Sequence, residues 1–114
     1  MSGRTRSSFS DAQLARVVPL LAALGDRTRL KLVLLLVQGG PQSLARLTGA
    51  TDITRQGVAK HLSVLEEAGL VSAQWAGRER QWQVEPDRLA PLREWIDELS
   101  LQWDRALTSL KEFT

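Results

Sequence analysis

The stretch ITRQGVAKHLSVLEEAGLV, at residues 53–71, separates its charged groups along its length. Its first half carries Arg55, Gln56, Lys60 and His61, and its second half carries two adjacent glutamates. Glutamine can make paired hydrogen bonds with adenine, while arginine and lysine bind guanine or phosphate. These side chains therefore suit contact with nucleic acid, provided that one surface presents them together.

A helix would divide this stretch into a core face and an outer face. Thr54 is a good N-cap and Gly69 supplies a left-handed C-terminal stop, which predicts a helix at about residues 54–68. Three apolar side chains then share the inward face: Val58, Leu62 and Leu65. The outer face holds mostly polar side chains, with an alanine at its edge: Gln56, Lys60, Ser63, Glu67 and Ala59. The candidate DNA contacts on this helix are Thr54, Arg55, Gln56, Ala59, Lys60, His61 and Ser63.

Two of these residues keep two interpretations. Arg55 lies nearer the core side of the helical wheel, so its contact with DNA depends on the geometry of the helix end. His61 also borders the core face, where it can bind a phosphate or pack as a structural histidine. Arg29, in the segment DRTRL, can meet a phosphate or an acidic neighbour.

The preceding segments predict further helices. Residues 1–10 are polar and are expected to form a flexible N-terminal arm before a single domain at residues 11–114. A first helix is expected to start near Asp11, which would be its N-cap, and to have a kink or restart at Pro19. Asp26 should cap a second helix to residue 38, and Ser43 a short third helix. A turn at residues 48–52 then completes a helix-turn-helix.

Residues 70–85 change to a β pattern. Two short β-prone runs flank the turn AGRE, which predicts a hairpin, or wing, with Arg78 and Arg80 beside its tip. Arginine at such a tip can bind phosphates or enter a minor groove. Trp75 and Trp82 are interpreted as core residues of the hairpin rather than stacking platforms for single strands.

The last helix, expected at about residues 87–113, carries a seam of apolar residues that alternates by three and four. Such a heptad seam is typical of helix pairing, because a small domain has little surface to cover so long a stripe. The alternative is a helix packed wholly on its own domain. The expected dimer interface is Leu14, Leu21, Leu92, Trp95, Ile96, Leu99, Trp103, Leu107 and Leu110.

Composition limits the function classes. The 114 residues carry a net charge of +2 and include one histidine and no cysteine. The lack of cysteine excludes disulfides and thiolate metal sites. The longest apolar run, at residues 32–37, is too short to span a bilayer, and the first ten residues have no signal-peptide core. We therefore expect a cytoplasmic protein with no membrane partner. With no P-loop and no dinucleotide fingerprint, we expect neither an enzyme nor a cofactor.

Three segments together resemble the ArsR/SmtB family of winged helix-turn-helix repressors. They are ALGDRTRLKLVLLL, ITRQGVAKHLSVLEEAGLV and GRERQWQVEP, so the resemblance covers about residues 20–84. It implies a homodimer that binds an inverted-repeat operator and releases it when an inducer or metal binds. The family's thiolate motif is missing from SLARLTG, its last-helix histidines are absent, and Ala59 stands where the recognition helix usually has serine. These departures favour the family's non-metal branch.

The sequence thus predicts a mainly α fold with a small β-hairpin wing, a winged helix-turn-helix that dimerises through its terminal helices. The predicted function is sequence-specific regulation of transcription, by repression, on double-stranded operator DNA. The alternative is a winged-helix protein-interaction module without specific DNA binding. A small-molecule inducer is left open, and no metal site is expected.

Overall fold

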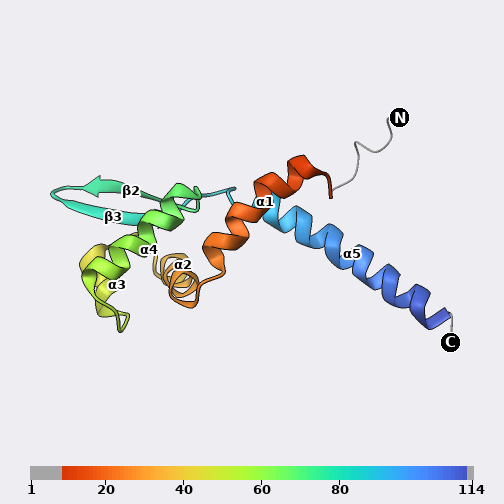
Figure 1. Ribbon diagram of the computed structural model, residues 1–114. Coiled ribbons are helices and arrows are strands. Elements are labelled where there is room, and N and C mark those ends of the chain that lie inside the picture. Colours follow the sequence, from red (N-terminus) through yellow and green to blue (C-terminus); the bar gives the residue numbers. More distant parts are fainter. Residues whose placement is uncertain (1–8, 113–114) are drawn as a thin grey trace.

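The computed structural model of the 114-residue chain describes residues 9–112. Figure 1 shows how its helices and strands are arranged. The elements are α1 (Asp11–Leu24), α2 (Arg27–Gly39), β1 (Gln42–Ser43), α3 (Leu44–Gly49), α4 (Arg55–Glu67), β2 (Val71–Ala76), β3 (Glu79–Val84) and α5 (Ala90–Glu112). This is the mainly helical fold with a hairpin wing that the sequence predicts. No helix within the described residues is long and apolar enough to cross a membrane.

Helix α1 begins at Asp11, where the sequence predicts its start, but it has a different N-cap. Its N-cap is Ser10 rather than Asp11, because the Ser10 hydroxyl accepts a hydrogen bond from the Gln13 backbone N–H at 3.2 Å. The helix continues through Pro19, so of the two expected outcomes, a kink or a restart, the restart does not occur. The proline frees only the carbonyl of Ala15, a residue that is exposed to solvent.

The predicted caps of the next three helices are confirmed. Each cap side chain accepts a hydrogen bond from a backbone N–H three residues later: Asp26 from Arg29, Ser43 from Arg46 and Thr54 from Gly57. Gly69 ends α4 with φ of +82°, a conformation that side chains with a Cβ rarely adopt. Because α3 extends to Gly49, the turn expected at residues 48–52 begins two residues later.

The sheet contains one strand more than the sequence indicates. Strands β2 and β3 form the predicted antiparallel hairpin, and β1 pairs with the other edge of β3, giving the order β1-β3-β2. The short strand places Gln42 opposite Trp82, and the Gln42 amide donates to the Leu35 carbonyl at 2.8 Å. Two residues are too few to show an alternating pattern, so sequence reasoning missed β1.

The core lies between the first four helices and the base of the hairpin. Its fully buried side chains include Leu32, Leu36, Leu47, Leu62, Leu65, Val17, Val58 and Val71. Trp82 joins this core with 7% of its surface exposed, which confirms its predicted role. Trp75 does not, because 71% of its surface remains exposed near the hairpin tip. The expectation that both tryptophans pack in the core is therefore wrong for Trp75.

Helix α5 begins later than predicted and leaves the domain. Residues 86–89 form a turn in which Asp87 has φ of +67°, so the helix starts at Ala90 rather than near residue 87. Its first turns pack on the domain through Leu92 and Trp95, and the Trp95 ring meets Phe9 edge-on at 6.4 Å between centroids.

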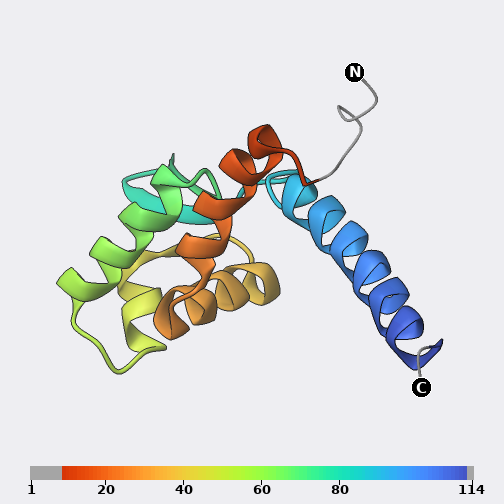
Figure 2. The same ribbon diagram turned by 45° about the vertical axis from the view of Figure 1, so that its right-hand side comes forward.

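The rest of α5 projects beyond the other elements (Figures 1 and 2). The molecule consequently measures 61 × 34 × 20 Å. The alternative of a last helix packed wholly on its own domain is thus wrong, because most of the C-terminal half of this helix is exposed.

Candidate nucleic-acid interface

Helix α4 follows α3 across a tight turn and divides its side chains as the sequence predicts. Its inward residues Val58, Leu62 and Leu65 are fully buried, which fixes the rotation of the helix on the core. The outward side chains near its start are exposed: Arg55, Gln56, Lys60 and Ser63. Arg55 is therefore exposed despite its position nearer the core side of the wheel, while Ala59 is half-buried. The Thr54 hydroxyl is committed to capping the helix.

His61 lies on the other side of α4, in a polar cluster with Asp26 and Arg29. Its Nδ1 is 3.4 Å from Nη1 of Arg29 and 4.0 Å from Oδ1 of Asp26. The Arg29 guanidinium also donates from Nε to the Ala23 carbonyl at 2.7 Å and from Nη2 to the Ala22 carbonyl at 3.2 Å. Arg29 thus holds the end of α1 and has an acidic neighbour, which was one of its two predicted roles.

The charge balance of this cluster favours an ionised Asp26. The backbone N–H of Arg29 donates to this carboxylate and, with the nearby Arg29 charge and His61, holds the pKa of Asp26 below its ordinary value of 3.8. The half-buried His61 ring therefore has partners within the domain. Contact between His61 and DNA stays a prediction.

A groove lies between α4 and the hairpin, and five of the predicted DNA contacts line it. Arg55, Ala59 and Ser63 contribute from α4, and Arg78 and Arg80 from the hairpin. The groove has a volume of about 410 Å³ and is here called the helix–wing groove. Gln56 and Lys60 lie outside it on the exposed face of the same helix, so the two sets form one continuous surface.

The hairpin presents its arginines in two different ways. Arg78 sits in the two-residue turn beside Gly77, whose φ of +68° allows the chain to reverse tightly. Arg80 is on strand β3, and its guanidinium carbon lies 4.8 Å from the centroid of the Trp82 ring. A ring below the cation holds its stem in place while the charged end stays exposed.

Residues that sequence reasoning did not assign to the site also line the helix–wing groove. Ser43, Leu44 and Ala45 form part of its wall, because β1 brings the start of α3 against β3. Glu66 and Glu79 line it as well, which leaves three arginines against two glutamates. Only the pairing of β1 with β3 reveals this wall, and the sequence carries no signal for it.

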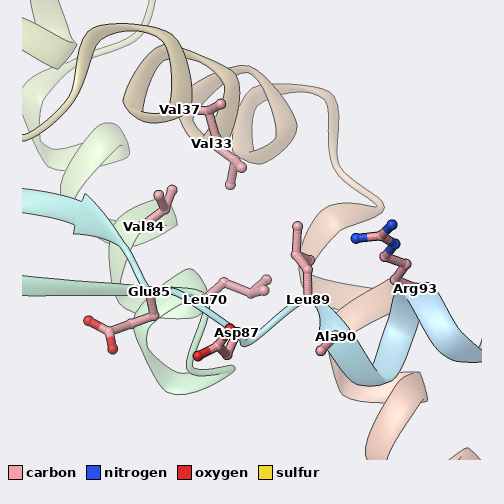
Figure 3. A pocket seen from close by; sticks show the side chains of 9 residues that line it. All are labelled: Val33, Val37, Leu70, Val84, Glu85, Asp87, Leu89, Ala90 and Arg93. Carbon is pink, nitrogen blue, oxygen red and sulfur yellow. The ribbon is translucent and has the colours of Figure 1, made fainter.

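A second cavity lies where α5 joins the domain (Figure 3). It has a volume of about 290 Å³, and its aliphatic walls come from α2, the base of the hairpin and the start of α5: Val33, Val37, Leu70, Val84 and Leu89. Its carboxylates belong to Asp87 and to Glu85, which accepts a hydrogen bond from the Ser72 hydroxyl. Arg93 completes the lining. Fewer cationic groups converge here than in the helix–wing groove.

Within residues 9–112 no group of three or more histidine and acidic side chains could hold a metal ion. The expected absence of a metal site stays a prediction, because it depends on binding.

The exposed apolar residues of α5 form the other notable surface. Ile96, Trp103, Leu107 and Leu110 are each more than 40% exposed, whereas Leu92 and Trp95 are covered within the chain. On α1, Leu21 is exposed and Leu14 half-buried. The predicted seam therefore divides into a first part that packs on the domain and a second part that faces outward. Phe113, which the seam would include, lies outside the described residues.

A short helix, a tight turn, an amphipathic second helix and an arginine-bearing hairpin define the winged helix-turn-helix class. Comparison with known proteins agrees. A family model described as a helix-turn-helix domain matches residues 24–72. The HTH-type transcriptional regulator Rv2034 of Mycobacterium tuberculosis is 40% identical over 86 residues, which are 75% of this chain and 77% of that protein.

Solved structures give the same result. An ArsR-like transcriptional regulator from Rhodococcus sp. RHA1 superposes with a TM-score of 0.76 at 29% identity, over 90% of this chain and 96% of that one. The homodimeric winged helix-turn-helix DNA-binding domain Mb0332 of Mycobacterium bovis has a TM-score of 0.64 at 24% identity, over 82% and 86% of the two chains. The chain belongs to the ArsR family of winged helix-turn-helix transcriptional regulators.

Proposed function

We propose that this regulator is a repressor that binds an inverted-repeat DNA operator as a homodimer. The observation that carries this proposal is the continuous surface of α4 and the hairpin, where exposed Gln56 and Lys60 adjoin three arginines of the helix–wing groove. This surface lies at the end of the molecule opposite α5 (Figure 1). One end therefore suits DNA and the other suits a second copy of the chain.

In this proposal the start of α4 enters the major groove. Gln56 and Lys60 lie one helical turn apart on the exposed face, where an amide can bond adenine and an amine can bond guanine or phosphate. The buried face of α4 supports this role because Val58, Leu62 and Leu65 hold the helix rigidly. Ser63, Ala59 and Arg55 turn toward the hairpin and would meet the sugar-phosphate backbone.

The exposed stripe of α5 would form the homodimer. The printed description of Mb0332 calls that domain homodimeric, and its fold is the same as the fold seen here. A two-fold axis beside α5 would present two copies of α4 to half-sites about one helical turn apart, roughly 34 Å. In this proposal the protein acts in the cytoplasm, where it binds DNA and catalyses no reaction. A small-molecule inducer would act by favouring the form that releases DNA.

The test compares Gln56→Ala with Arg78→Ala on a duplex selected from randomised DNA and on a scrambled duplex. Gln56→Ala should cost about 1–3 kcal/mol per half-site on the selected duplex and little on the scrambled one. Arg78→Ala should weaken both and lower the slope of affinity against salt by about one per contact. Gln38→Ala and Arg105→Ala are matched controls, since both residues are exposed and lie on α2 and α5.

Each assignment has its own contrary result. If Gln56→Ala loses the same affinity for both duplexes, α4 does not recognise bases. If Arg78→Ala leaves the salt slope unchanged, the hairpin does not contact the DNA backbone. If the wild-type protein binds no selected duplex, the chain is instead a protein-interaction module with this fold.

A further inference from the structure

The inner face of the hairpin extends past the helices that cover it. Three cross-strand pairs share this face: Val71 with Val84, Ala73 with Trp82, and Trp75 with Arg80. The first two pairs pack on the core or beside it, and the third lies nearest the tip. Trp75 is 71% exposed, although the two pairs closer to the base of the same face are covered.

The opposite face of the hairpin is already polar. The Gln74 amide donates to the Gln83 side-chain carbonyl at 2.8 Å, and the Ser72 hydroxyl donates to the Glu85 carboxylate. Trp75 therefore does not lie on the solvent face of the hairpin. A large apolar ring left uncovered on the inner face indicates a contact surface, because its burial by a partner would be favourable.

The surroundings of Trp75 indicate what that partner is. Its cross-strand neighbour Arg80 lines the helix–wing groove together with Arg55 and Arg78. One guanidinium group opposite the indole, with two more in the adjoining groove, matches a polyanion that also has apolar surface. The tip of the hairpin and the C-terminal end of α5 lie at opposite ends of the molecule (Figure 1), so a second copy held by the exposed part of α5 would lie away from the hairpin tip.

We propose that Trp75 packs its indole ring against a deoxyribose of the bound duplex, beside phosphates held by the arginines of the helix–wing groove. This inference rests on the proposed DNA-binding function. The bases of a duplex are stacked within it, whereas the sugars offer C–H surface at the edge of the grooves. The Trp75 contact would thus add affinity without adding charge, which separates it from the arginine contacts.

The test measures binding of the full-length chain to the selected duplex at several salt concentrations. Trp75→Ala should raise Kd about tenfold per half-site, which corresponds to about 1.4 kcal/mol, and leave the salt slope unchanged. Trp75→Phe should recover most of the affinity because it keeps an aromatic face. Gln74→Ala is the matched control, since Gln74 is next to Trp75 in the chain and lies on the polar face. This variant should bind the duplex as the wild type does.

Fluorescence gives a second readout that a structural role would not move. In the free protein, acrylamide should quench the indole fluorescence of the wild type more than that of Trp75→Phe, which keeps the exposed Trp103, and the duplex should remove this difference. Unchanged affinity of Trp75→Ala, or an equally accessible Trp75 in the complex, would overturn the inference while leaving the proposed function intact. Loss of all duplex binding by the wild-type chain would instead overturn the proposed function itself.

Discussion

Replacement of Trp103 tests the proposed dimer at the largest exposed side chain of α5. A buried tryptophan removes about 150–250 Å² from water. Because Trp103 is 62% exposed, a partner could cover roughly 90–150 Å² of it. At 25 cal/mol per Å², that burial stabilises the dimer by about 2–4 kcal/mol.

The two-fold symmetry of a homodimer doubles this effect. Each residue in such an interface occurs twice, so Trp103→Ala should cost about 4–8 kcal/mol as an upper estimate. Since 1.4 kcal/mol corresponds to a tenfold change, the dimer Kd should rise by roughly a thousandfold or more. Trp103→Glu should weaken the dimer further, because it would bury a carboxylate in an apolar contact.

Sedimentation equilibrium over a range of protein concentrations measures this change directly. The wild type should be a dimer at micromolar concentration and Trp103→Ala a monomer, with helical circular dichroism confirming that the domain stays folded. Arg105→Glu is the control, since it adds a negative charge to an exposed position on the other side of α5. A wild-type monomer, or a Trp103→Glu variant that remains dimeric, would show that the exposed stripe does not pair two chains.

Two further predictions concern charge and metal. Because the pKa of Asp26 is lowered in the fold, its ionised carboxylate stabilises the protein above the ordinary pKa of 3.8, and this stabilisation is lost as the pH falls through the lowered pKa. The difference in unfolding free energy between the wild type and Asp26→Asn, measured by urea unfolding, should therefore become smaller in acid. A constant difference down to low pH would contradict this. Calorimetry with zinc, nickel and cadmium should show no submicromolar stoichiometric site, and such a site coupled to weaker operator binding would reverse the expectation.

The local signals in the sequence predicted most of the helical fold. Asp26, Ser43 and Thr54 accept the capping hydrogen bonds that their residue types favour. The inward face of α4 followed from its helical period, because one rotation buries its apolar residues together. These features depend on residues three or four positions apart, which a sequence displays directly.

Features that depend on contacts between distant residues could not be predicted. The large apolar surface of tryptophan predicted the same core role for Trp75 and Trp82, yet only the packing of the helices on the hairpin decides which one is covered. Strand β1 brings Ser43 against β3 and so builds a wall of the helix–wing groove from a segment with no strand signal. The expected core role of Trp75 was wrong because the sequence does not show which positions of the hairpin the helices cover.

The cluster around Arg29 shows why the cationic residues at the start of α4 have different roles. His61 and Arg29 are 32 positions apart, and only the fold places their nitrogens 3.4 Å from each other. Arg29 in turn donates to carbonyls in the last turn of α1, so the cluster ties α4 to the helix that packs on α5. Lys60 and Gln56 stay exposed on another face of α4. The fold therefore divides one polar segment into a part that positions the helix and a part that is free to meet DNA.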